Sequence, residues 1–203
     1  MDVMFVPSGL VILLAYHVWL WHKSRTQPFT TTFGRDADGR RLWVPAMMKD
    51  IDKKNIVSVQ SLRNVIMGST LMATTAILIC AGLGTVISST YTHGDFIVGM
   101  KYATLLAIFL SSFLCHTFSI GFLNQVNILI CTPQDVKSLV TSEYLTQLLD
   151  KAIILNTVGN RLFYSALPLL RWIFGPVLTF LSSMAMVIIL YNLDFLAGNG
   201  NNR

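Results

Sequence analysis

The stretch VIMGSTLMATTAILICAGLGTVI, residues 65–87, carries no charged side chain and decides the fold. A helix needs roughly 20 apolar residues to cross the hydrocarbon core of a bilayer. Three other uncharged stretches reach or approach that length, at residues 3–21, 102–130 and 176–193. The sequence therefore predicts an all-α integral membrane protein, with four transmembrane helices in a single domain that covers residues 1–203.

The composition agrees with this class of protein. Of the 203 residues, 53% are hydrophobic and 12% are charged, whereas a soluble domain has about 25% charged residues. No cation precedes Lys23, so the first apolar stretch lacks the basic start of a secretory signal peptide and is expected to stay as a helix. Cys80, Cys115 and Cys131 lie in or at the end of apolar stretches, which predicts neither a disulfide framework nor a zinc site.

The Lys and Arg residues predict how the chain is oriented. The connection 88–99 has none, whereas the segment between Trp21 and Val65 has nine: Lys23, Arg25, Arg35, Arg40, Arg41, Lys49, Lys53, Lys54 and Arg63. Cytoplasmic loops carry the excess of cations. We therefore expect the loops 22–64 and 132–171 in the cytoplasm and both termini on the extracytoplasmic side, by default at the plasma membrane. Only Lys101 and Arg203 would then lie outside, and cations placed for topology give no reason to expect nucleic acid as a partner.

The sequence predicts an amphipathic helix in each of the two inner loops. From Arg40 to Lys54, apolar side chains alternate with charges, which is typical of a helix on a membrane surface. A second helix is expected to start at Thr132, which would cap it ahead of Pro133. It is expected to carry an apolar stripe and to lie on the inner membrane face or against residues 102–130. The stripe consists of Val136, Leu139, Val140, Tyr144 and Leu148. Pro168 and the Gly175-Pro176 pair are expected to break the helical pattern that follows.

The most polar stripe of any span lies in residues 102–130. Ser112, His116, Ser119 and Asn127 follow one another at helical spacing, and they are the candidates for lining a pore. His116 has three interpretations: a structural residue hydrogen-bonded between helices, a pore or proton-relay group, or a haem or metal ligand, for which His17 could supply a second axial ligand. The sequence leaves these interpretations open.

Two pairs of a cation and an amide precede spans on the predicted inner side. They are Arg63-Asn64 and Asn160-Arg161. One interpretation is helix termination at the headgroups, where Arg meets lipid phosphate. The other is an inner mouth that attracts anions, because rings of cationic side chains favour anions in protein pores.

Several phrases of the chain resemble a known family. They are Gln60-Ser61-Leu62-Arg63-Asn64, the run from Gly68 to Ile77, Asn156-Thr157-Val158-Gly159-Asn160-Arg161, and Trp172-Ile173-Phe174-Gly175-Pro176. Together they resemble the plant branch of an integral membrane family known as domain of unknown function 599. The resemblance covers nearly the whole chain and implies a four-helix membrane protein. It brings no activity, so no site residue follows from it.

No motif for catalysis, a cofactor or a metal is visible, so we expect no enzyme. The leading hypothesis is a homo-oligomeric channel or pore, lined by residues 65–87 or 102–130. Anions are favoured because the inner vestibule would be basic and the spans contain no acids. One alternative is a membrane scaffold or accessory subunit that binds a cytoplasmic protein through the inner amphipathic helices. The other is a haem-binding redox protein of the membrane.

Overall fold

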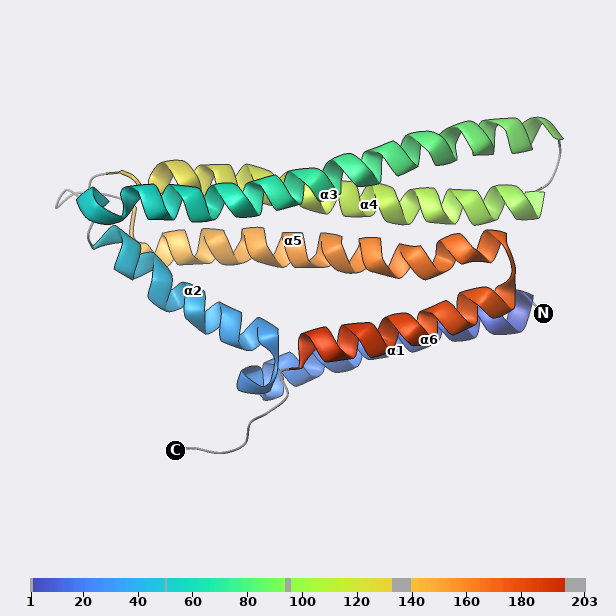
Figure 1. Cartoon of the computed structure of the whole chain (residues 1–203), viewed down its shortest axis with the longest axis horizontal. Helices are drawn as coiled ribbons and strands as arrows, with labels where there is room; N and C mark the ends of the chain where they lie inside the picture. The colour runs from blue at the N-terminus through green and yellow to red at the C-terminus, as the bar shows by residue number, and fades with distance from the viewer. Residues whose placement is uncertain (1, 50, 94–95, 133–139, 196–203) are drawn as a thin grey trace. The chain divides into compact units, whose positions relative to one another are not determined.

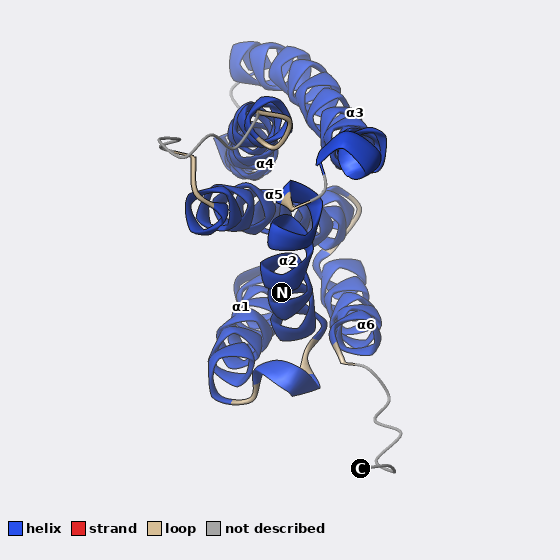
Figure 2. Cartoon of the chain, turned by 90° about the vertical axis from the view of Figure 1, so that its left-hand side faces the viewer, coloured by secondary structure: helices blue, strands red, loops and turns tan. Residues whose placement is uncertain are grey.

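The computed structural model describes residues 2–49, 51–93, 96–132 and 140–195 (Figure 1). Within these ranges the regular structure is helical and no strand occurs (Figure 2). The α-helices are α1 (Asp2–Thr26), α2 (Thr32–Met48), α3 (Ile51–His93), α4 (Phe96–Leu129), α5 (Ser142–Leu170) and α6 (Pro176–Asp194). Two short 3₁₀ helices, η1 (Pro28–Thr30) and η2 (Arg171–Ile173), precede α2 and α6.

The four predicted spans are confirmed as helices that are long and apolar enough to cross a membrane. They cover Met4–Thr26 in α1, Lys54–Thr90 in α3, Val98–Leu129 in α4 and Pro176–Asp194 in α6. The chain is therefore an all-α, multi-pass membrane protein. It forms two compact units, and each contains two of these helices: residues 1–39 with 164–203, and residues 40–163.

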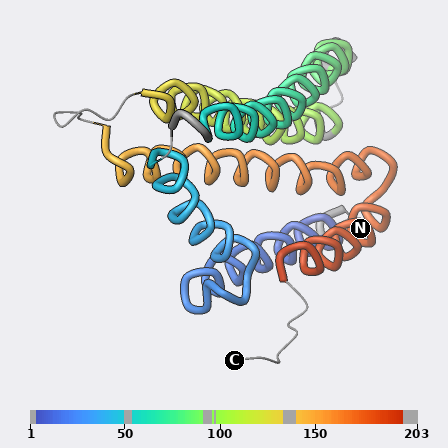
Figure 3. The backbone as a smooth tube through the Cα atoms, turned by 60° about the vertical axis from the view of Figure 1, so that its left-hand side comes forward, coloured from blue at the N-terminus to red at the C-terminus, as the bar shows by residue number. Residues whose placement is uncertain are grey.

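In the unit of residues 40–163, α3 and α4 form an antiparallel hairpin (Figure 3). Ala76 is fully buried, and the Cys80 thiol lies 3.9 Å from the carbonyl oxygen of Leu106. Small residues let two helix backbones approach closely where lipid gives no hydrophobic drive for association. The buried face of α3 therefore packs on α4.

The helix α5 runs antiparallel to α4 along most of its length. At one end, Leu123 and Val126 of α4 share a buried core with Leu145 and Leu148 of α5. At the other, the rings of Phe109 and Phe163 meet edge to face at 5.4 Å. The contacts thus follow α4 from its C-terminal end almost to its start.

This course of α5 differs from the sequence-based expectation. Residues 132–171 were expected to form an inner loop in which Pro168 breaks the helix, but α5 continues through Pro168 to Leu170. The other predicted break, at Gly175-Pro176, is confirmed: α6 begins at Pro176, and Gly175 before it has a φ of 153°, a conformation that glycine tolerates. The predicted capped start at Thr132-Pro133 and the stripe residues Val136 and Leu139 reach into residues 133–139, which lie outside the described ranges.

In the other unit, α1 and α6 lie side by side and run in the same direction. Near their starts, the rings of Phe5 and Phe180 are 6.0 Å apart. Near their ends, the Tyr16 hydroxyl donates a 2.5 Å hydrogen bond to the carboxylate of Asp194. The sequence analysis placed the ends of these two helices on opposite sides of the membrane, whereas the structure brings the ends together. Cation counts assign loops to sides but do not determine which helix ends meet.

Candidate functional site

The buried polar cluster of the second unit is centred on His116 in α4, Asn156 in α5 and Ser69 in α3. The amide oxygen of Asn156 accepts a 2.9 Å hydrogen bond from the Ser69 hydroxyl. The same oxygen lies 3.1 Å from Nδ1 of His116, a distance that fits an Nδ1–H donor. One amide therefore joins all three helices.

The backbone of α5 completes this cluster. His116 has no exposed surface, and its Nε2 faces Gly159 so closely that a Cβ at residue 159 would lie 2.8 Å away. The hydroxyl of Ser112 donates to the Gly159 carbonyl at 2.8 Å, and that of Ser119 donates to the Ala152 carbonyl at 2.7 Å. These bonds fasten α5 to α4 over about two helical turns.

The pore-lining candidates are thus brought together, but on a face of α4 that α5 covers. Ser112, His116 and Ser119 are fully buried. Asn127 is half-buried, and its Oδ1 has no hydrogen-bond partner among the described residues. The three buried residues fit the structural interpretation, in which polar side chains bond between helices.

The inner-mouth candidates lie at two different levels. Arg63 and Asn64 are exposed on α3, one to two turns before Ser69, whereas Asn160 and Arg161 are half-buried and follow Asn156 on α5. The two helices run parallel, because both are antiparallel to α4. At a rise of 1.5 Å per residue, Arg63 and Arg161 are therefore separated by roughly 16 Å along the helix axes. The structure does not bring these two pairs together.

The packing around His116 does not fit ligation of a haem iron. Its Nδ1 is used by Asn156, and the backbone at Gly159 covers Nε2. His17 belongs to the other unit, where its Nδ1 lies 2.7 Å from the carbonyl oxygen of Leu13. In the described part of the chain, no group of three or more His, Cys, Asp or Glu side chains could hold a metal ion.

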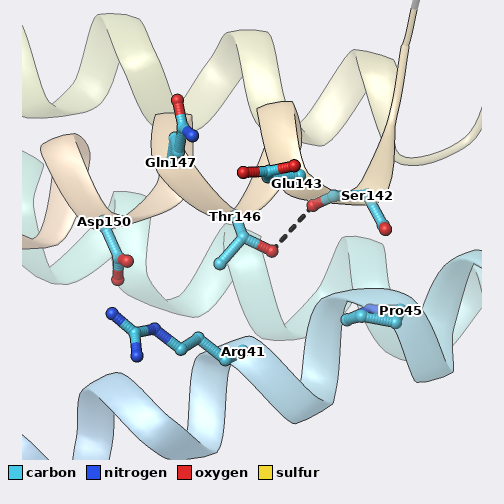
Figure 4. A pocket seen from close by; sticks show the side chains of 7 residues that line it. All are labelled: Arg41, Pro45, Ser142, Glu143, Thr146, Gln147 and Asp150. Atoms are coloured by element: carbon cyan, nitrogen blue, oxygen red, sulfur yellow. Dashed lines mark hydrogen bonds between the residues drawn. The ribbon is translucent and has the colours of Figure 1, made fainter.

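A polar depression of about 340 Å³ lies between α2 and the first turns of α5. It is lined by Arg41, Pro45, Ser142, Glu143, Thr146, Gln147 and Asp150. The side chains of Arg41 and Asp150 point toward one another across it (Figure 4). Next to it, Nε of Arg40 lies 2.7 Å from the carboxylate of Asp150. Charged side chains of α2 and α5 thus pair here. The amphipathic helix expected from Arg40 to Lys54 does not form as one element, because α2 ends at Met48 and α3 begins at Ile51.

The face of α3 turned away from α4 was not singled out from the sequence. It carries Asn64, Gly68, Gly82, Thr85 and Ser89, all exposed. No atom lies within 4 Å of a Cβ placed at Gly68 or Gly82. The sequence does contain small and polar residues at helical spacing on this face. However, α3 has a second face of the same kind, and only the packing shows which of the two lies against α4.

Comparison with known proteins gives a family and no activity. One family model, described as protein of unknown function, DUF599, matches residues 4–198. No curated protein and no solved structure matches the chain.

Proposed function

The chain belongs to the DUF599 family, and from the geometry of its α3–α4–α5 unit we propose that it forms a homo-oligomeric channel that favours anions. Copies would assemble around the uncovered face of α3, in the plasma membrane of a plant cell. The proposed role is not enzymatic. Of the two segments that the sequence offered as lining the pore, the proposal retains residues 65–87. The buried residues Ser112, His116 and Ser119 of α4 are assigned a structural role.

The observation that carries this proposal is the exposed face of α3. Asn64 and Gly68 are exposed at one end of this face, and Gly82 and Thr85 are exposed toward the other end, with exposed Leu71 and Leu78 between them. In a membrane, small residues on such a face allow close approach of another helix. Amide and hydroxyl groups on the same face offer polar contacts to a passing ion.

Arg63 supplies the preference for anions. It is exposed one residue before Asn64, about 100° around the helix axis from it and next to the loop between α1 and α3. Several copies arranged around an axis would form a ring of guanidinium groups, and such rings favour anions. Arg161 lies elsewhere along the axis and takes no part in this ring.

Reconstitution into liposomes tests the proposal. Purified protein is expected to be monodisperse at several times the mass of one chain and to pass chloride faster than potassium. Arg63→Gln is expected to lower the chloride-to-potassium permeability ratio several-fold. Arg25→Gln, which removes a cation that lies 4.6 Å over the Trp21 ring of α1, is the matched control and should leave the ratio unchanged. Oligomers that pass no ion at any voltage or pH would refute the channel.

A second candidate function rests on the depression between α2 and α5. Its mixture of Arg41, Glu143 and Asp150 would suit a cytoplasmic protein partner with charges of both signs, in line with a scaffold or accessory subunit. Exposed Leu42 and Tyr144 lie on the same two helices. If this function holds, Leu42→Glu and Tyr144→Glu abolish a stoichiometric complex, and the reconstituted protein carries no flux.

A further inference from the structure

We infer that α5 is a fifth membrane crossing, so that the chain after α6 lies on the same side as the basic loop and Arg161 lies near the middle of the bilayer. This inference does not depend on the channel. Its first ground is the parallel packing of α1 and α6.

The pairing of α1 with α6 is in register along both helices. A Cβ at Gly9 would lie 3.1 Å from Oγ of Ser183. The Trp19 ring stacks on that of Tyr191, with centroids 6.2 Å apart. Since both helices have the length and composition of spans, they cross the membrane in the same direction. The chain must therefore return to the starting side of α1 before Pro176.

Only α5 can make that return. Between the end of α1 and the start of α3 lies α2, whose charged residues Arg35, Asp36, Arg40 and Arg41 do not suit a crossing. Helices α3 and α4 then cross and come back as an antiparallel pair. The chain is thus on the basic side when α5 begins at Ser142, and it must be on the other side when α6 begins.

The packing of α5 in the second unit supports the same course independently. Its residues Ala152, Asn156, Gly159 and Phe163 meet successive turns of α4 from Ser119 back to Phe109. Phe109 is only eight residues from Lys101, the cation at the far end of α4. Seven more residues of α5 reach Leu170, which at 1.5 Å per residue covers roughly the remaining 10 Å.

The depth of Arg161 follows from these pairs. It lies on α5 between Gly159, which meets Ser112, and Phe163, which meets Phe109. Starting after Lys101, roughly 20 residues of α4 cover the hydrocarbon core, so Ser112 is about halfway through. A charged side chain at this depth is costly in lipid and faces protein or a wet cavity. This is a site of a different kind from the inner mouth expected of Asn160-Arg161.

The distribution of cations is compatible with five crossings. The segment between Trp21 and Val65 keeps its nine Lys and Arg residues on the inner side, where Arg203 joins them. Lys101 and Arg171 are then the cations outside. The bias that orients the chain therefore keeps the same sign with five crossings as with four, although Arg161 no longer adds to it.

Two positions change sides between the two topologies and make the test decisive. Phe174, which is 81% exposed between α5 and α6, lies outside with five crossings and inside with four. Asn201, after α6, does the opposite. Phe174→Cys and Asn201→Cys are labelled with an impermeant thiol reagent in intact cells and after permeabilisation. Gly94→Cys and Gly39→Cys, in the connections α3–α4 and α1–α3, give the outside and inside references.

The expected result is labelling of Phe174→Cys in intact cells and of Asn201→Cys only after permeabilisation. The opposite pattern, or equal labelling of both from one side, overturns the fifth crossing. Each variant is compared with the parent protein. Native Cys80 and Cys115 lie within spans, and burial raises the pKa of the Cys131 thiol, which keeps the background low. If Phe174→Cys changes the elution profile of the protein in gel filtration, the neighbouring exposed residue is used in its place, as Ile173→Cys.

A second measurement tests the depth of α5 itself. Val158, an exposed residue three positions before Arg161, is changed to Cys. Within a crossing helix it reacts with a water-soluble reagent only after denaturation. Labelling at the rate of Gly39→Cys in permeabilised cells would place α5 in the cytoplasm and overturn the inference.

Discussion

Gly159 lies against the imidazole of His116, at a distance that leaves no room for a side chain. A Cβ on residue 159 would come 2.8 Å from Nε2 and 2.9 Å from Cδ2 of the ring. The ring cannot easily turn away, because its Nδ1 is held by Asn156 and the residue has no exposed surface. The packing of α5 against this turn of α4 therefore depends on a glycine and a histidine together.

Gly159→Ala is expected to destabilise the protein. Overpacking a core costs about 1–3 kcal/mol, which exceeds the gain of about 1 kcal/mol that alanine brings to a helix. The thermal unfolding midpoint in detergent measures the net change. Gly121→Ala, on the exposed side of α4 where a Cβ would meet no atom within 4 Å, is the control and should be neutral or stabilising. In a His116→Ala background the cost of Gly159→Ala should shrink, because the clashing ring is gone. An equal cost in both backgrounds would contradict the packing.

Asn156→Leu is expected to separate three helices at once. It removes the acceptor of the Ser69 hydroxyl and the partner of His116 Nδ1. Interhelical polar bonds in membrane proteins average about 0.6 kcal/mol each, with a maximum near 1.7, so a total loss of about 1–2 kcal/mol should appear in detergent unfolding. Asn124→Leu, on the exposed side of α4, is the matched variant and should cost little. A loss of similar size there would show that the cluster has no special role.

Tyr16→Phe is expected to loosen the pair of α1 and α6. Asp194 is 1% exposed, and the change removes the hydroxyl that donates to its carboxylate. Loss of a hydrogen bond to a buried carboxylate costs about 1.5–3 kcal/mol. The readout is again the unfolding midpoint, with Tyr191→Phe as control because that residue is half exposed and keeps its stacked ring. Equal effects of the two changes would argue against the Tyr16 contact.

Arg40→Gln is expected to have a small effect on stability. The pair with Asp150 is short at 2.7 Å, but both side chains are partly exposed, at 18% and 25%. Exposed ion pairs are worth about 0.2–1 kcal/mol and weaken in salt. The sharper readout is limited proteolysis of the loop between α1 and α3, which should become faster at low salt while the unfolding midpoint hardly moves. Lys49→Gln gives the comparison, since Lys49 is exposed at the end of the same loop helix.

The four apolar spans could be predicted because a long uncharged stretch is stable in lipid as a helix, which satisfies its own backbone hydrogen bonds. The helix α5 could not be recognised as a crossing in the same way. Residues 152–172 include Asn156, Asn160 and Arg161, and these polar residues lower the mean hydropathy of the segment. In the structure, the Asn156 amide and two backbone carbonyls of α5 are hydrogen-bonded to side chains of α3 and α4. A hydropathy scale gives the cost of placing a side chain in lipid, whereas Asn156 contacts Ser69 and His116 and not lipid.

The candidate site shows the same division. The polar stripe Ser112, His116 and Ser119 was visible as a helical period, but its partners Ser69, Asn156 and Gly159 lie more than 30 residues away along the chain. Residues at helical spacing show which side chains share a face of a helix, but they do not show which other helix covers that face. The exposed and buried faces of α3 are both rich in small residues, so their roles became distinguishable only when one was found against α4.

By itself, the sequence determined that this is a membrane protein of helices, where four of them run, and which loop collects the cations. These properties are local, because the length, charge and apolarity of a stretch decide whether it suits lipid. Only the tertiary structure decided that α1 and α6 run in parallel, that α5 lies along α4, and that His116 is packed between helices. Those properties depend on contacts between residues far apart in the chain, such as Tyr16 with Asp194 and Ser112 with Gly159, which no local pattern encodes.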